Sequence, residues 1–213
     1  MATYDLDEQE RLDELKAWWK RWGNLVMVGL AVVVAAAAGW RYWQNQVVTQ
    51  SLEAATVYEQ LTRSLVANDA KAARDAGAML IDQYKGTAYA PRAALLLAKL
   101  NVGAKDLKSA QAQLEWAVAN SKEPAVKDLA RLRLAGVQLD QKQYDAALKT
   151  LSATHSDAFA FRFHDLKGDV LLAQGKPAEA RAAYQAAFGK AAEDNAYRNI
   201  IELKLDALGG EAK

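Results

Sequence analysis

Residues 163–188 read FHDLKGDVLLAQGKPAEARAAYQAAF. Apolar positions recur at helical spacing on both sides of Gly175 and Pro177, and glycine ends helices while proline begins them. The segment therefore predicts two antiparallel helices joined by a short turn. Small residues at Gly168 and Ala180 would let the two helices approach closely, so the stretch predicts a tightly packed helical hairpin.

The same spacing recurs twice upstream, first 33 residues earlier and then a further 37 residues earlier. The matched positions are Gly168, Leu171, Gly175, Ala180, Tyr184 and Ala187 in the last unit, Ala135, Tyr144, Ala147, Leu148 and Leu151 in the middle unit, and Ala98, Ala110, Leu114 and Ala117 in the earliest. This pattern of small, large and aromatic positions resembles the tetratricopeptide repeat. Residues 47–84 have the length of a further hairpin but little of the consensus. The resemblance implies an α-solenoid of stacked helical hairpins.

Helical periodicity continues through residues 47–213, and hairpin dipeptides such as Asn-Gly are missing. The predicted helices are 47–67, 70–84, 88–102, 107–120, 125–141, 144–153, 159–174, 177–190 and 194–208. All three prolines, Pro91, Pro124 and Pro177, fall near predicted helix starts. No linker rich in Gly, Pro or Ser divides the helices, so the fold class is all-α with one helical domain after residue 44.

Residues 22–40 read WGNLVMVGLAVVVAAAAGW and contain no charged side chain. As a helix they would reach roughly 28 Å, close to the hydrocarbon thickness of a bilayer. Aromatic side chains that favour the membrane interface stand at both ends, and the basic side chain among them can reach the headgroups. These interface residues are Trp18, Trp19, Trp22, Trp40, Arg41, Tyr42 and Trp43. We predict a single transmembrane helix over residues 23–43.

Basic residues predict the orientation of this helix, because they concentrate on the cytoplasmic side. Arg11, Lys16, Lys20 and Arg21 precede the apolar run, whereas Arg41 is isolated after it. Residues 1–22 should therefore form a cytoplasmic amphipathic segment, and residues 44–213 should be translocated.

Three alternatives stay open for the N-terminal region. Ala36 to Ala38 have the small-x-small pattern that a signal peptidase cleaves, although the N-terminal region is long and acidic for a signal sequence. The apolar run would otherwise be the core helix of a soluble protein, which does not explain the polar-tipped aromatics at both ends. The residues GWRYW at 39–43 would either fix the depth of the helix or contact another membrane helix.

The sequence contains little that predicts catalysis. Cysteine is absent, which excludes thiol chemistry, Cys-based zinc sites and disulfides. The two histidines, His155 and His164, lack metal-ligand spacing, and no Gly-rich phosphate loop is present. A net charge of +1 without a basic block argues against nucleic acid as a partner. We therefore predict a protein that is not an enzyme and that has no cofactor, metal or small-molecule substrate.

Aromatic residues of the helical domain are predicted to be core. Phe159 and Phe163 share a helix face, as core residues do. Trp116 should pack between repeats, with a partner contact as the alternative.

The repeat register predicts which residues face the concave surface of the solenoid, the surface on which such proteins bind partners. It lies on the first helix of each hairpin, and leucines of the middle hairpin would form an apolar floor suited to an extended or unfolded chain. The alternative is that Leu132 is a core residue between repeats. The candidate groove residues are Arg92, Leu95, Lys99 and Val102, then Leu129, Leu132 and Leu139, then Arg162, Asp165, Asp169 and Leu172.

A cytoplasmic stub, one crossing that ends in GWRYW, and a degenerate tetratricopeptide domain resemble the YfgM family of bacterial inner-membrane proteins. Further similarities are YDAALKTL at 144–151 and RLRLAGVQL at 131–139. The resemblance implies an ancillary subunit of the SecYEG translocon in the inner membrane, with a periplasmic helical domain. It also implies association with the membrane-anchored prolyl isomerase PpiD and a role in handing emerging proteins to periplasmic chaperones. The alternative is a membrane-anchored scaffold for envelope complexes unrelated to secretion.

Overall fold

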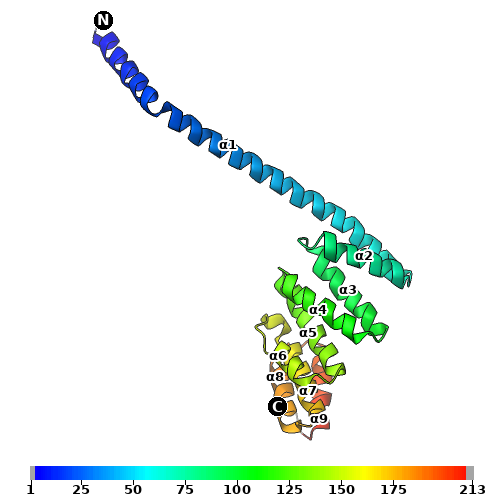
Figure 1. The fold of residues 1–213 in the computed structure, drawn as a ribbon. Helices are drawn as coiled ribbons and strands as arrows, with labels where there is room; N and C mark the ends of the chain where they lie inside the picture. The colour runs from blue at the N-terminus through cyan, green and yellow to red at the C-terminus, as the bar shows by residue number, and fades with distance from the viewer. Residues whose placement is uncertain (1–2, 210–213) are drawn as a thin grey trace. The chain divides into compact units, whose positions relative to one another are not determined.

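The computed structural model describes the backbone of residues 3–209 and the side chains from residue 10 onward. The ends of the predicted segments 1–22 and 44–213, namely residues 1–2 and 210–213, lie outside this part. Nine α-helices and no strand occur within it (Figure 1). The helices are α1 (Thr3–Val66), α2 (Ala70–Gln83), α3 (Tyr89–Gly103), α4 (Leu107–Asn120), α5 (Pro124–Asp140), α6 (Tyr144–Leu151), α7 (Asp157–Ala173), α8 (Pro177–Lys190) and α9 (Arg198–Ala207). The predicted all-α class is confirmed.

Most predicted helix boundaries agree with the structure, and two differ for physical reasons. The break expected before residue 47 is absent, because neither glycine nor proline occurs between Trp40 and Val66 to interrupt the helical hydrogen bonds of α1. The last helix begins at Arg198 rather than at residue 194. There the side chain of Asn195 accepts a hydrogen bond from the Tyr197 amide at 3.0 Å, which holds a turn before α9.

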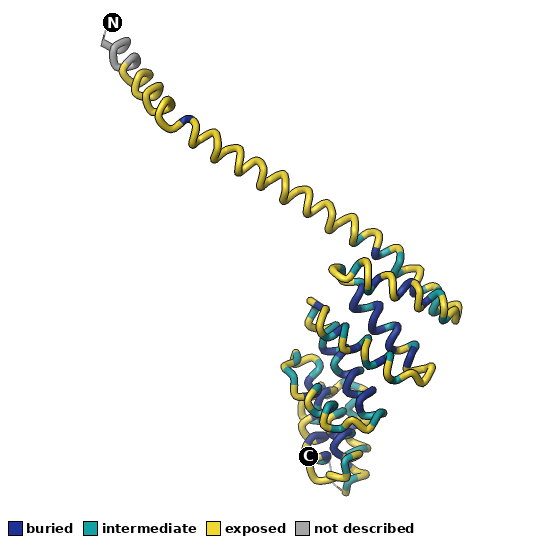
Figure 2. Tube along the Cα trace, in the orientation of Figure 1, coloured by how far each residue is buried: buried dark blue, intermediate teal, exposed yellow. Residues whose placement is uncertain are grey.

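The chain divides into two compact units, Met1–Gln50 and Ser51–Lys213. In the first unit the apolar run of α1 is almost entirely exposed (Figure 2). The exception is Gly23, over which the ring of Trp19 lies, 3.2 Å from the position of an added Cβ. This is the one helix in the described part that is long and apolar enough to cross a membrane.

The second unit is a row of helical hairpins that share their cores. Each of its four buried clusters joins both helices of one hairpin to the first helix that follows it. Thus residues 51–66 of α1 pack with α2 and α3, then α3 and α4 pack with α5, α5 and α6 with α7, and α7 and α8 with α9. A core that runs from hairpin to hairpin is the arrangement of a solenoid, as predicted.

The four hairpins close with the same turn. One residue in each turn has a left-handed backbone, and the amide of the next residue donates to the carbonyl five positions back, as in a Schellman motif. The left-handed residues are Asn68, Lys105, Lys142 and Gly175, with φ of 56°, 60°, 59° and 76°. Their spacing of 37, 37 and 33 residues matches the sequence repeat, so residues 51–83 form a genuine first repeat despite their weak consensus.

The tetratricopeptide consensus weakens in the first hairpin because its small and large residues exchange places relative to the last hairpin. A Cβ added to Gly168 would lie 2.4 Å from the ring of Tyr184, so only glycine fits there. In the first hairpin the sizes are reversed, with buried Leu61 at the position equivalent to Gly168 and Gly77 at the position equivalent to Tyr184. Gly77 instead receives Leu97 of α3, whose Cδ1 lies 2.5 Å from where a Cβ would stand.

Candidate partner-binding groove

Three hollows follow one another along the face lined by α1, α3, α5 and α7. The α1–α3 hollow has a volume of about 690 Å³, the α3–α5 hollow about 400 Å³ and the α5–α7 hollow about 390 Å³. Lys99 lines both the first and the second, and Arg133 and Gly136 line both the second and the third. Because neighbouring hollows share residues, they form one groove along the first helices of the hairpins.

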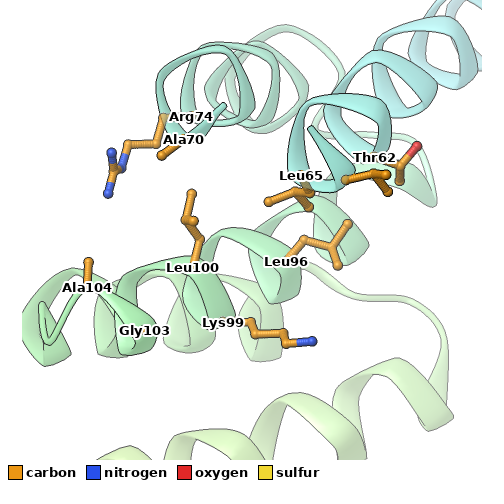
Figure 3. A pocket seen from close by; sticks show the side chains of 10 residues that line it. Thr62, Leu65, Ala70, Arg74, Leu96, Lys99, Leu100, Gly103 and Ala104 are labelled. Atoms are coloured by element: carbon orange, nitrogen blue, oxygen red, sulfur yellow. The ribbon is translucent and has the colours of Figure 1, made fainter. Parts of the chain in front are cut away.

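The α1–α3 hollow is the most apolar section of the groove (Figure 3). Leu65 of α1 faces Leu96 and Leu100 of α3, and Arg74 of α2 lies at one edge. This section lies wholly within the second unit and was only partly anticipated from the sequence, through Lys99.

The α3–α5 hollow combines apolar walls with two basic side chains, Lys99 and Arg133. Val102 of α3 is 38% exposed and faces a surface formed by Arg133, Gly136 and Asp140 of α5. Nη1 of Arg133 donates to the carbonyl oxygen of Leu95 at 3.2 Å, and burial lowers the pKa of this guanidinium.

The α5–α7 hollow brings together five residues that the sequence placed in the groove: Leu129, Leu132, Arg162, Asp165 and Asp169. Tyr197, from the segment before α9, completes its wall. The repeat register therefore places these five side chains around one hollow, and whether a partner binds there stays a prediction.

The C-terminal helix α9 occupies the acidic end of the groove. Nζ of Lys204 lies 2.8 Å from Oδ1 of Asp165 and 2.7 Å from Oδ1 of Asp169. Burial alone would lower the pKa of Lys204, but its hydrogen bonds to the two aspartates outweigh burial and raise it. The two aspartates that the sequence offered to a partner are thus bound by the chain's own lysine.

Two tyrosines, Tyr184 of α8 and Tyr197 just before α9, also bind the aspartates at this end of the groove. The hydroxyl of Tyr184 donates to Asp169 at 2.8 Å, and that of Tyr197 donates to Asp165 at 2.9 Å. Burial and then these hydrogen bonds to carboxylates raise the pKa of both tyrosines. The guanidinium of Arg162 lies 5.0 Å from the ring centroid of Tyr197, so it too is engaged within the chain.

The remaining predicted groove residues lie at other places. Arg92 forms an ion pair with Glu123 at 2.6 Å, and Leu172 is exposed near the end of α7. Leu95 is 5% exposed in the core of α3, α4 and α5, and Leu139 packs against the core of α5, α6 and α7. Leu132 is 9% exposed and packs with Phe163, so it is a core residue that borders the hollow.

Sequence reasoning missed Gly136, Arg133 and the residues of α9 that line or fill the groove. Gly136 could have been noticed in the sequence, because an isolated glycine inside a predicted helix usually has a packing or functional reason. The pairing of Lys204 with Asp165 and Asp169 had none, since it joins residues 39 and 35 positions apart.

The aromatic residues at both ends of the apolar run are exposed. Trp18, Trp19 and Trp22 stand before it and Trp40, Tyr42 and Trp43 after it, with ring centroids of Trp40 and Trp43 5.4 Å apart. Arg41 is also exposed. Exposure on a single helix is compatible with an interface belt and with a helix contact alike, so both predictions remain.

The remaining aromatic and histidine side chains are part of the packing. His155 stacks on Phe163 with ring centroids 4.2 Å apart, and burial, followed by nearby cationic groups, lowers the pKa of His164. Trp116 packs against the core of α3, α4 and α5. Among the residues with described side chains, no three carboxylates or histidines gather as metal ligands do.

Repeated hairpins, a common turn and a groove along the first helices define the chain as a helical-repeat protein of the tetratricopeptide class, with an apolar helix suited to membrane anchoring. A family profile described as "Tetratricopeptide repeat-like domain" matches residues 16–210. Curated relatives that match along nearly the whole chain carry the name "Ancillary SecYEG translocon subunit".

The relative from Neisseria gonorrhoeae is 32% identical over 98% of this chain and 100% of its own length. The relative from Haemophilus influenzae is 32% identical over 87% and 90%, and that from Escherichia coli K12 is 31% identical over 98% and 99%. The chain belongs to this family of ancillary SecYEG translocon subunits and is a membrane-anchored protein.

Proposed function

We propose that this protein is a non-enzymatic adaptor at the SecYEG translocon, which binds segments of emerging proteins and helps hand them to periplasmic chaperones. The observation that carries the proposal is similarity over nearly the whole chain, anchor and hairpins together, to relatives named as translocon subunits. A helical-repeat domain with a groove along its first helices supports protein binding as the activity.

The proposed topology has residues 1–22 in the cytoplasm, 23–43 in the bacterial inner membrane and 44–213 in the periplasm. The distribution of basic residues on the two sides of the apolar run supports this orientation. In this arrangement the aromatic residues Trp40 and Trp43 lie at the periplasmic surface, and the groove faces the compartment into which proteins emerge.

The proposed partners are the translocon, the membrane-anchored prolyl isomerase PpiD and unfolded or extended protein segments. Leu65, Leu96 and Leu100 of the α1–α3 hollow offer an apolar surface that an unfolded chain can cover. Nucleic acid and small-molecule substrates are not part of the proposal.

The first experiment identifies the complex. The full chain, tagged at its C-terminus, is purified in mild detergent, and recovered proteins are compared by mass spectrometry with those from a tagged single-pass membrane protein of another family. Specific recovery of translocon subunits and PpiD supports the proposal. Recovery of division or cell-wall proteins instead would favour a scaffold for envelope complexes.

The second experiment asks whether the groove meets emerging chains. A photo-crosslinking residue is placed at Val102, which is exposed in the α3–α5 hollow, or at Lys108, which is exposed on α4 outside the three hollows. In cells pulse-labelled during secretion, Val102 should crosslink to newly made exported proteins well above the level at Lys108. Equal crosslinking at the two positions would contradict a role for the groove.

A further inference from the structure

Gly136 lies in the middle of α5 and on the floor of the groove, where the α3–α5 and α5–α7 hollows meet. Glycine inside a helix is unfavourable by about 1 kcal/mol relative to alanine, so a glycine there usually has a packing reason. Gly77 and Gly168 have one, because Leu97 and Tyr184 occupy the space of a side chain. At Gly136 no atom lies within 4 Å of an added Cβ.

Nothing within the described part of the chain therefore requires glycine at position 136. Four other helical glycines also have open space. Gly103 and Gly189 lie in the last turn of a helix, where glycine is tolerated, and Gly29 and Gly39 lie in the predicted transmembrane segment of α1, where glycine is more frequent than in soluble helices. Because glycine has no side chain, Gly136 makes the groove deeper at this point. Any side chain at 136 would project into the groove at the point where the two hollows join.

Apolar side chains surround this deep point. Val102 and Leu114 lie in the α3–α5 hollow, and Leu129 and Leu132 lie in the α5–α7 hollow. An occupant that reaches Gly136 would thus leave water for an apolar surface, which favours an apolar side chain over a polar one.

Near Gly136 two acidic side chains form ion pairs within the described part of the chain, whereas the two basic ones do not. Asp165 and Asp169, on the α7 side, are both bound by Lys204. Lys99 of α3 and Arg133 of α5 form no ion pair with any residue that the structure describes. Asp140 lines the same hollow, but it lies seven residues beyond Arg133 on α5, roughly 10 Å along the helix axis.

We propose that Gly136 marks the seat of a bulky apolar side chain from a partner protein, and that Lys99 and Arg133 pair with carboxylates beside it in the same segment. The partner chemistry is therefore an acidic, apolar protein segment. This inference rests on the proposed function of the groove as a binding site for protein segments, and it specifies which segments bind.

The test uses the full chain in zwitterionic nanodiscs and a fluorescent peptide in which phenylalanine and leucine alternate with glutamate. A twin peptide carries lysine in place of each glutamate. Fluorescence anisotropy at low salt should show at least about tenfold tighter binding of the glutamate peptide, because only its charges complement the two cations. Rising salt should weaken that preference.

Two pairs of matched variants locate the binding. Gly136→Trp fills the deep point and should weaken binding of the glutamate peptide by about tenfold or more, whereas Gly136→Ala should have a much smaller effect. Lys99→Glu should weaken binding by about tenfold, whereas Lys108→Glu, which makes the same charge change outside the groove, should change it less than about twofold. Circular dichroism of all four variants confirms that each is folded.

The outcomes separate this inference from the proposed function. Equal binding of the two peptides, binding of neither, or normal binding by a folded Gly136→Trp variant would overturn the acidic, apolar assignment. If crosslinking of exported proteins at Val102 persists in that case, the proposed function stands and only the partner chemistry is refuted. Loss of both refutes the two proposals together.

Discussion

Gly168 and Gly136 are both glycines inside helices, yet substitution by alanine should change stability in opposite directions. A Cβ at Gly168 would lie 2.4 Å from the ring of Tyr184, so Gly168→Ala should lower the free energy of unfolding by roughly 1–3 kcal/mol. Gly136 has open space, so Gly136→Ala should raise it by up to about 1 kcal/mol. Urea unfolding followed by circular dichroism of the full chain measures both, and changes of the same sign would contradict the packing described.

The left-handed residues in the hairpin turns give a second pair of opposite changes. Gly175→Ala places a Cβ at φ 76° and should lower the free energy of unfolding by about 1 kcal/mol. Lys142 already has φ 59° with a side chain, so Lys142→Gly should remove strain and raise stability by up to about 1 kcal/mol. Thermal unfolding of the two variants tests this, and a destabilised Lys142→Gly would mean that the lysine side chain contributes more than its backbone strain costs.

At this scale the sequence predicted which helix face a residue is on better than how deeply the residue is buried. The repeat register placed Leu132 beside the groove, and it does border the α5–α7 hollow. Its burial depends on Phe163 of α7, a neighbour 31 positions away that the register alone does not place. Gly136 shows the converse, because its role comes from space left empty and not from a side chain.

Helix α9 should depend on Lys204 for its position at the acidic end of the groove. Lys204→Met leaves Asp165 buried and Asp169 half-buried without their cation, which should lower the free energy of unfolding by roughly 3 kcal/mol. Hydrogen exchange of the α9 amides should rise most. Lys167→Met, which removes an exposed lysine of α7, serves as the control and should have little effect.

The pH dependence of this contact follows from the raised pKa of Lys204. The folded protein holds the proton of Lys204 more tightly than the unfolded chain, in which the pKa has its ordinary value of 10.5. As the pH rises, the stabilisation by this proton therefore stays complete up to pH 10.5 and is lost as the pH passes the folded-state pKa. As the pH rises from neutral, the difference in stability between the wild-type chain and Lys204→Met should therefore shrink only in strongly alkaline solution. A difference that shrinks at neutral pH would contradict the ion pairs.

Helices with clear stop signals were predictable and those without were not. Prolines, glycines and the repeat fixed α4 and α8 to the residue. The continuity of α1 across the membrane-proximal segment was missed, because the transmembrane helix 23–43 and the helix 47–67 were predicted separately although nothing between them prevents helix formation. The position at which α9 packs against α7 was also missed, since contacts between side chains far apart in the sequence determine it.

For the whole molecule, an apolar helix followed by a helical-repeat domain was predictable from local signals, because membrane anchors and repeats both have short-range sequence patterns. Family membership adds the translocon to this picture through relatives that match along nearly the whole chain. The predicted orientation across the membrane rests only on the distribution of basic residues. This orientation decides whether the groove can meet exported proteins at all.

Protease accessibility tests that orientation, with one tag at the N-terminus and another at the C-terminus. In spheroplasts, added protease should remove the C-terminal tag and the hairpin domain while the N-terminal tag survives, because Arg11, Lys16, Lys20 and Arg21 favour the cytoplasmic side. Without protease, both tags should remain on one polypeptide of full length, which distinguishes an anchor from a signal sequence cleaved near Ala38. Survival of the C-terminal tag in intact spheroplasts, with loss only after lysis, would place the groove in the cytoplasm. It could not then receive chains that leave the translocon, and both the topology and the adaptor proposal would fall.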